Sequence, residues 1–338
     1  MNLKEFAAHI GLSQTTVSRA LGGYPEVRPA TRERVLKAAA EFGYQPNISA
    51  QRLATGRAGA IGLVFQGDGR FGPHASEFLG GLSGRLQTDG MDILVATVET
   101  QEAELAAYRR FAASRRVDAV IVHTPTLRDR RIALLQELDL PFVVHGRSAA
   151  ARPFAYLDID NYGAIAAAAR HLLDLGHRRI ALINGYVENT YARDREQGFR
   201  DALEGAGIRP PPTLLAYGAF TDEAGFRTMQ RFLALPEPPT AVIAGSMMSA
   251  LGAMRAVRIA GLSVGRDISL VAHDDVFPYL SPDNLVPTVS TTRSPMRAAG
   301  ERMADMVLKL LQGTPPEALQ EVWPVELVIR RSTERAPE

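Results

Sequence analysis

Apolar side chains in the first fifty residues recur with the spacing of amphipathic helices. The positions that would share a core are Leu3, Phe6, Ala7, Ile10, Val17, Ala20, Leu21, Val35, Leu36, Ala39 and Phe42. They predict three helices, the second over residues 14–21 and the third starting near Pro29, because proline suits a first helical turn. Gly11 would end the first helix, and Ser13 can cap the second. Two short helices joined by a glycine turn and braced by a third form a helix-turn-helix.

From about residue 60 onward, short apolar runs alternate with helical stretches. The runs predict strands over residues 60–65, 92–98, 119–122, 141–145, 180–184, 241–244 and 268–272. Helices are expected between them over residues 76–87, 102–114, 161–175, 193–206 and 246–260. This alternation is typical of parallel sheets with helices on both faces. The segment is too long for one six-stranded sheet, so we expect two α/β lobes with a ligand cleft at the carboxyl ends of the strands.

The outer face of the second predicted helix carries Gln14, Thr15, Ser18 and Arg19. Arginine can donate two parallel hydrogen bonds to guanine, and glutamine can pair with the edge of adenine. Hydroxyl groups and a helix N-terminus suit phosphates. A solvated helix face has the same polar composition, so these residues alone leave both interpretations open.

Charge is unevenly distributed along the chain. The 338 residues have a formal net charge of +1, which excludes a polyanion-binding mechanism that uses the whole chain. Residues 1–57 carry eight basic and four acidic side chains, which suits a small DNA-binding piece on a mildly acidic body. Ordinary scatter would also produce such an excess.

Several classes of function lack the residues they need. The chain has no cysteine, which excludes disulfides, thiolate metal sites and cysteine nucleophiles. His171 and His177 do not share a helix face, and no catalytic set stands out, so we expect no metal, no cofactor and no enzymatic activity. The N-terminus does not read as a secretion signal, and no run reaches the roughly 18 apolar residues of a membrane span. We therefore expect a cytoplasmic protein.

The sequence resembles the LacI/GalR family of bacterial transcription regulators. The N-terminal segments that carry the resemblance are residues 12–21, 31–35, 43–47, 54–57 and 61–64, and those in the body are residues 160–163, 175–181, 250–255, 267–271 and 273–275. The resemblance implies an all-α helix-turn-helix headpiece (residues 1–46), a hinge-helix linker (47–57) and a two-lobe, periplasmic-binding-protein-like α/β core (58–331). It places the first lobe at about 58–158 and 286–314, and the second at about 159–285 and 315–331.

The resemblance also assigns DNA contacts. Those to base edges are Gln14, Thr15 and Arg19, and those to the backbone are Ser13, Thr16 and Ser18. The hinge contributes Asn47, Ala50 and Leu53; it is marginal as an isolated helix and would form on the operator, where Leu53 would wedge into the minor groove. One departure from the family is Arg28-Pro29, which stands where a small polar residue usually caps the third helix.

A small-molecule effector is expected between the lobes. By resemblance, its site is lined by Phe71, Phe78, Arg147, Asp160, Tyr191, Arg195, Phe220, Ser246 and Asp274. Aspartate and arginine can bracket sugar hydroxyls, and a flat aromatic ring can stack on a pyranose. Most of the family have an Asn-Asp pair near Ser246, which this chain lacks. The expected effector is a mono- or oligosaccharide, with a purine or another metabolite as the alternative.

Together these features predict a sequence-specific DNA-binding regulator, expected to repress genes of carbohydrate metabolism. A homodimer would bind double-stranded operator DNA, and effector binding would change the hinges. The alternative of a solute-binding module for transport would need a secretion signal and no headpiece. Residues 67–72 match GxGxxG, a pattern of dinucleotide-binding sites. Pro73 would then lie inside a helix, so a loop over the cleft is the preferred interpretation.

Overall fold

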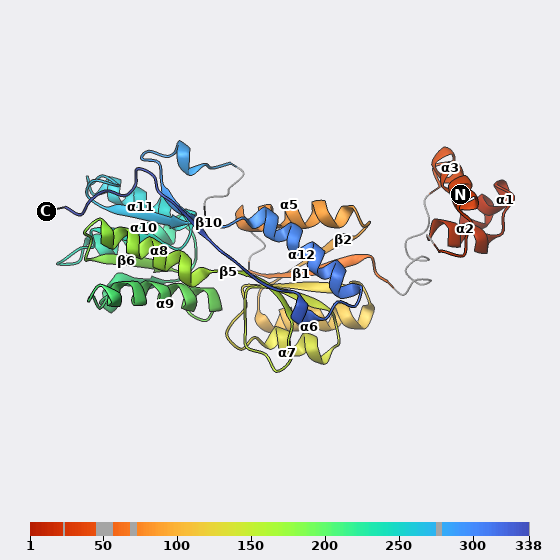
Figure 1. Cartoon of the computed structure of the whole chain (residues 1–338), viewed down its shortest axis with the longest axis horizontal. Helices are drawn as coiled ribbons and strands as arrows, with labels where there is room; N and C mark the ends of the chain where they lie inside the picture. Colours follow the sequence, from red (N-terminus) through yellow and green to blue (C-terminus); the bar gives the residue numbers. More distant parts are fainter. Residues whose placement is uncertain (23, 45–56, 68–72, 275–278, 338) are drawn as a thin grey trace. The chain divides into compact units, whose positions relative to one another are not determined.

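The computed structural model describes residues 1–22, 24–44, 57–67, 73–274 and 279–337. Within them the chain forms two compact units, Met1–Gly59 and Ala60–Glu338, and Figure 1 labels many of their elements. The expected hinge segment, apart from Arg57, lies outside the described residues.

The described residues of the first unit form a bundle of three helices, α1 (Leu3–His9), α2 (Gln14–Leu21) and α3 (Pro29–Glu41). Its buried core is made of Phe6, Ala7, Ile10, Val17, Ala20, Val35, Ala39 and Tyr44. The prediction that Leu36 and Phe42 belong to this core is wrong, because they are 50% and 46% exposed. Val35 and Ala39 lie one turn apart and define the buried face of α3, and Leu36 is rotated about 100° away from it.

Local hydrogen bonds explain where the headpiece helices begin. The hydroxyl of Ser13 accepts the backbone N–H of Thr16 at 3.0 Å, which confirms Ser13 as the N-cap of α2. Asn2 and Glu5 form a capping box at α1 that the sequence reasoning missed. Arg28 makes no side-chain cap bond to α3, as expected from its replacement of a small polar residue.

The first lobe of the second unit is built on a six-stranded sheet with the order β11-β5-β4-β3-β1-β2 and only parallel pairs. The strands are β1 (Ala60–Gln66), β2 (Asp92–Val98), β3 (Ala119–His123), β4 (Phe142–His145), β5 (Ala155–Ile159) and β11 (Gln320–Trp323). One face packs against α5 (Pro73–Gln87) and α12 (Met296–Leu311). The other packs against α6 (Gln101–Ser114) and α7 (Arg130–Glu137) (Figure 1).

The second lobe has a six-stranded sheet with the order β12-β10-β9-β8-β6-β7, in which only β12 is antiparallel to its neighbour. The strands are β6 (Ile180–Asn184), β7 (Leu215–Tyr217), β8 (Ala241–Ala244), β9 (Ser269–His273), β10 (Ser290–Arg293) and β12 (Glu326–Val328). The helices are α8 (Asn161–Asp174) and α9 (Thr190–Gly205) on one face, and α10 (Asp222–Leu233) and α11 (Met247–Ile259) on the other. Short 3₁₀ helices lie at Pro212–Leu214, Pro282–Asn284 and Pro316–Ala318.

The expected parallel α/β lobes are present, but two of the expected lobe boundaries are wrong. β10 lies in the second sheet and β11 in the first, so the chain changes lobe between β10 and α12 and again between β11 and β12. The error has a physical cause. β10 reads Ser-Thr-Thr-Arg, and its first three residues are buried although they are polar, so no apolar run marks the strand.

Candidate functional site

The outward face of α2 is the candidate DNA-reading surface of the first unit. Gln14, Thr15, Ser18 and Arg19 are exposed there, while Val17 and Ala20 hold the opposite face in the core. Ser13 is also exposed, and its hydroxyl lies 2.8 Å from that of Thr16, which is partly buried. All six predicted contact residues therefore lie within residues 13–19, and none of the six belongs to the buried core. The other three predicted DNA contacts, Asn47, Ala50 and Leu53, lie outside the described residues.

A cavity of about 300 Å³ lies between the two lobes, at the carboxyl ends of their strands. It is lined by Phe65, His74, Ala75, Phe78, His123, Thr124, Pro125, His145, Gly146, Arg147, Asp158, Ile159, Asn161, Thr190, Tyr191, Arg195, Phe220, His273, Asp274, Ser294 and Met296. A crevice at this end of parallel strands is where open α/β folds bind their ligands. The cavity is therefore the candidate effector site.

Aromatic rings form the first-lobe wall of the cavity. Phe65 stacks on His123 with centroids 5.4 Å apart, and Phe78 meets the same imidazole edge-on at 4.7 Å and stacks on His145 at 5.2 Å. Burial lowers the pKa of His123 well below its usual value and also lowers that of His145, so both rings are neutral near pH 7. The wall thus offers flat apolar faces and uncharged imidazole nitrogens.

Arg195 is the central charged group of the second-lobe wall. Its Nε donates to Asn161 Oδ1 at 2.8 Å, and one terminal nitrogen donates to the carbonyl of Gly245 at 2.9 Å. The guanidinium carbon also lies 4.9 Å from the ring centre of Tyr191 and 6.0 Å from that of Phe220. Burial lowers the pKa of Arg195, although arginine still remains charged. A fixed, buried guanidinium beside two aromatic rings is a preorganised donor for ligand oxygens.

Asp274 faces the cavity from the end of β9. Its backbone is left-handed, with φ of 66°, a conformation that costs free energy and that clusters at functional sites. One carboxylate oxygen lies 3.4 Å from His74 Nε2, and the other lies 3.2 Å from His273 Nε2. Burial raises the pKa of Asp274, but the basic groups around it outweigh that effect and hold it below its usual range. The cavity therefore contains a carboxylate that is ionised near neutral pH.

Two buried atoms at the cavity lack hydrogen-bond partners within the described part of the chain: His123 Nε2 and Asp274 Oδ1. The 3.2 Å contact of Asp274 Oδ1 with His273 is close enough for an ion pair but does not have hydrogen-bond geometry. Buried polar atoms are almost always satisfied, and an exception calls for an explanation. A ligand with hydroxyl groups would supply partners for both atoms.

Arg147 joins the lobes at the edge of the cavity. Its Nε donates to Asp158 Oδ2 at 2.7 Å in its own lobe, and a terminal nitrogen donates to Asp194 Oδ2 at 2.9 Å on α9. Burial lowers the pKa of Arg147, but the hydrogen bond and charge of Asp158 outweigh it, and the net pKa is raised. Arg147 therefore stays cationic and links the two lobes.

The structure brings most of the predicted effector residues together. Six of them line the cavity: Phe78, Arg147, Tyr191, Arg195, Phe220 and Asp274. Asp160 and Ser246 do not, because each caps a helix: Asp160 accepts the N–H of Gly163 at 2.8 Å, and Ser246 accepts that of Ser249 at 3.1 Å. Phe71 belongs to residues 68–72 of the GxGxxG segment, which lie outside the described residues.

Sequence reasoning missed the histidines of the cavity. His123, His145 and His273 each stand at the carboxyl end of a strand, directly after a run of apolar residues. That position was a usable signal, since the carboxyl ends of parallel strands meet at the cleft. Asp158 on β5 and Asn161 at the start of α8 were missed in the same way.

The buried histidines make the stability of this unit depend on pH. Burial, with a contribution from Arg195, lowers the pKa of His273 to about 3 in the folded protein. Below its usual pKa of about 6.5, the unfolded chain binds a proton that the folded chain cannot, so the free energy of unfolding falls as the pH falls. We expect His273 alone to contribute a loss of about 2 kcal/mol between pH 7 and pH 5.

Urea unfolding followed by the fluorescence of Trp323, the only tryptophan, measures this effect in the second unit. The variant His273→Gln should show a smaller loss of stability between pH 7 and pH 5 than the wild type. An unchanged pH dependence in this variant would contradict the assignment of a low pKa to His273.

Two further features of the described residues bear on function. No group of three or more histidine, aspartate or glutamate side chains among them could hold a metal ion. No helix within the same residues is long and apolar enough to cross a membrane.

Comparisons with known protein families match both units. A family model described as bacterial regulatory proteins, lacI family, matches residues 2–47. A second, described as a periplasmic binding protein-like domain, matches residues 169–333. The matches coincide with the three-helix headpiece and with much of the two-lobe unit.

Curated relatives align over nearly the whole chain. The HTH-type transcriptional regulator AglR of Rhizobium meliloti (strain 1021) is 49% identical, over 100% of this chain and 96% of that protein. The HTH-type transcriptional regulator RafR of Escherichia coli is 36% identical, over 96% of each.

Solved structures agree with these matches. The lac repressor dimer bound to operator and the anti-inducer ONPF superposes with a TM-score of 0.84 at 30% identity, over 99% of both chains. The transcriptional regulator CelR–cellobiose complex gives a TM-score of 0.73 at 30% identity, over 98% of this chain and 99% of that one.

Proposed function

Because the chain belongs to the lacI family of bacterial regulatory proteins, we propose that it is a cytoplasmic, sugar-responsive transcription regulator that represses genes of carbohydrate metabolism. This family consists of transcription regulators rather than of enzymes. The headpiece would read operator DNA through Gln14, Thr15 and Arg19, and the inter-lobe cavity would hold the effector.

The chemistry of the cavity carries the proposal of a sugar. Neutral imidazoles can both donate and accept hydrogen bonds, while Arg195 donates and Asp274 accepts. Flat rings beside these groups suit the faces of a pyranose. Two arginines and two aspartates line the cavity and balance one another, which favours a neutral ligand over an anion. A neutral ligand with many hydroxyl groups meets all these conditions, and the CelR relative was solved with cellobiose.

The proposed mechanism is a two-state switch. A homodimer would bind a pseudo-palindromic operator with one headpiece on each half-site, as the lac repressor dimer binds its operator. Asn47, Ala50 and Leu53 would contact the DNA as part of the hinge, with Leu53 in the minor groove. The sugar would bridge the lobes and favour one arrangement of them. It can shift operator affinity only by its difference in affinity for the two states.

A selection experiment tests this function. The purified full chain is used to select duplexes from a random DNA library. The affinity for the selected duplex is then measured with and without maltose, raffinose, cellobiose, glucose and adenosine. We expect a pseudo-palindromic duplex, and at least one sugar that changes its affinity by about tenfold or more.

Two outcomes would contradict the proposal separately. Equal affinity for the selected duplex and for a random duplex would overturn the DNA-binding function. A response to adenosine alone would retain the regulator but overturn the sugar as its effector.

A further inference from the structure

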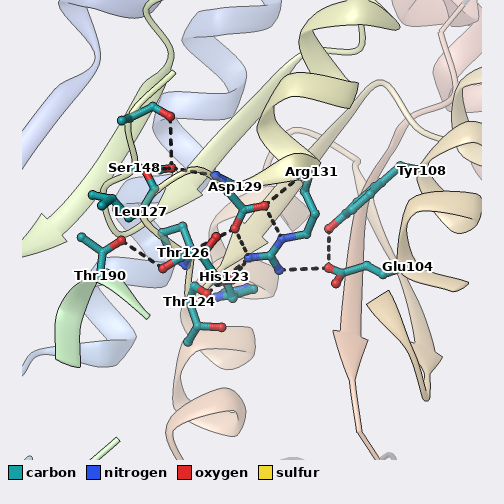
Figure 2. A network of polar contacts seen from close by, with 12 residues as sticks. Glu104, Tyr108, His123, Thr124, Thr126, Leu127, Asp129, Arg131, Ser148 and Thr190 are labelled. Carbon is teal, nitrogen blue, oxygen red and sulfur yellow. Dashed lines mark hydrogen bonds and ion pairs between the residues drawn. The ribbon is translucent and has the colours of Figure 1, made fainter. Parts of the chain in front are cut away.

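Figure 2 shows a buried network of charged side chains that reaches the backbone of His123, a residue of the first-lobe wall of the cavity. Arg131 on α7 is its centre. Its guanidinium donates to Asp129 Oδ1 at 2.9 Å and Oδ2 at 2.7 Å, and to Glu104 Oε1 at 3.0 Å. Tyr108 donates its hydroxyl proton to the same Glu104 oxygen at 3.1 Å.

The burial of this network makes its geometry rigid. Glu104, Asp129 and Arg131 are 1%, 4% and 9% exposed. Burial lowers the pKa of Arg131 and raises that of Asp129, but their mutual hydrogen bonds outweigh burial and reverse both shifts. Replacing such a pair by apolar residues is often neutral or stabilising, so a buried pair is weak evidence of a purely stabilising role. A role in fixing the surrounding backbone would explain why the charges are there.

The backbone that the network fixes is the loop after β3. Arg131 donates to the carbonyls of His123 at 3.0 Å and Thr124 at 3.3 Å, and Asp129 accepts the N–H of Thr126 at 3.0 Å. Thr124 is held with φ of 45°, a left-handed conformation that is strained for a β-branched residue. The network thus holds a strained chain reversal over residues 123–126.

The same loop contacts both the cavity and the second lobe. His123, Thr124 and Pro125 line the cavity, and His123 Nε2 is one of the buried cavity atoms without a hydrogen-bond partner in the described part of the chain. The carbonyl of Pro125 accepts two hydrogen bonds from Thr190 on α9, one from its N–H at 3.0 Å and one from its hydroxyl at 3.2 Å. The next residue, Tyr191, lines the cavity from the second lobe.

We propose that Arg131 is a positioning residue for the effector site: it fixes the loop after β3 so that the Pro125 carbonyl contacts Thr190 across the lobes while His123 faces the ligand. Arg131 itself does not line the cavity. The inference rests on the proposed effector function of that cavity. Its consequence is that ligand binding and the contact between the lobes share one rigid support.

Hydrogen exchange in the full chain, without any ligand, tests the support directly. In the variant Arg131→Lys the charge remains, but one ammonium cannot reproduce the planar fork that contacts two carboxylates and two carbonyls. We expect exchange of the Thr190 amide to accelerate by about tenfold or more, because its acceptor is no longer held in place. The exchange rates of the α10 backbone amides should not change. Arg130→Lys is the matched control, because the neighbouring Arg130 is exposed and pairs only with Glu102 among the described residues.

A double-mutant cycle tests the link to the ligand. Thr190→Val removes the hydroxyl donor, and Thr190→Pro removes both donors. Proline is compatible with this place because Thr190 is the first residue of α9 and Asn189 before it is extended. Affinities are measured by calorimetry with maltose, raffinose and cellobiose as probes. We expect Arg131→Lys and Thr190→Pro each to weaken binding by about tenfold, and Thr190→Val by less.

The sugar affinity of the double variant, Arg131→Lys with Thr190→Pro, is the decisive measurement. If Arg131 acts through the contact between Pro125 and Thr190, the double variant should lose about tenfold, as each single variant does, rather than about a hundredfold. Fully additive losses, or wild-type exchange at Thr190 in folded Arg131→Lys, would overturn the proposal. If Arg131→Lys does not fold, Glu104→Gln takes its place, because the neutral amide weakens the charge-assisted bond to Arg131 while its oxygen still fills the same position. If no sugar binds the wild type, the proposed effector class fails, and the exchange experiment still decides the role of Arg131.

Discussion

Replacing Arg195 with methionine is expected to weaken sugar binding by about 100-fold or more, because a buried guanidinium makes charge-assisted hydrogen bonds worth about 1.5–3 kcal/mol each. The described residues account for two of its five N–H donors, those to Asn161 and Gly245, and the others remain for a ligand. Methionine keeps an unbranched side chain of similar length, so the aromatic walls retain a neighbour. The loss should therefore come from the donors rather than from collapse of the cavity.

Calorimetry with the sugar that binds the wild type gives the affinity, and thermal unfolding checks the fold. Arg255→Met is the matched control. It also removes a guanidinium from the second lobe, where Arg255 stacks 3.9 Å above the ring of Phe226 and pairs with Asp222, but it does not line the cavity. Operator affinity without sugar should be unchanged in both variants. Wild-type sugar affinity in folded Arg195→Met would remove Arg195 from the binding site.

Replacing Arg19 with alanine is expected to weaken operator binding by about 1–3 kcal/mol for each headpiece, the discrimination that a bidentate contact with guanine provides. A dimer would place one copy on each half-site, so the effect on the whole complex should be about twice as large. Arg19 is exposed on α2 and contributes nothing to the core of the first unit, so thermal stability should not change. Sugar affinity should also stay at the wild-type value.

The pattern of loss separates base recognition from attraction to phosphate. Arg19→Lys keeps the positive charge but not the paired donors, so it should lose affinity for the selected operator while retaining that for a random duplex. Lys37→Ala removes one exposed charge from α3, away from the proposed reading face, and serves as the control. If Arg19→Ala lost equal affinity for the operator and for a random duplex, Arg19 would contact the DNA backbone rather than a base.

The headpiece could be predicted almost completely because its signals are local. The bounds of α2 follow from Ser13, which caps it, and from apolar positions one turn apart. Leu36 and Phe42 were wrongly placed in the core because an apolar residue at the edge of a helix face does not reveal whether a partner helix covers it. Seven of the twelve strands in the described residues were predicted, those marked by a run of mostly apolar residues, and β5, β7, β10, β11 and β12 were missed. β7 and β12 have only three residues each. β10 was missed because its buried side chains are Ser290, Thr291 and Thr292.

The features of the candidate site also differ in whether the sequence or only the tertiary structure reveals them. The sequence by itself determined the exposed polar face of α2, the alternation of strands and helices, and the residues available as donors and acceptors, since each depends on neighbours along the chain. Only the tertiary structure decided that Asp160 caps a helix, that histidines line the cavity, and that Arg131 supports a loop contacted by Thr190. Which residues line the cavity depends on which strand ends of the two lobes face each other. The chain passes from one lobe to the other more than once, so the spacing of residues along the sequence does not reveal this arrangement.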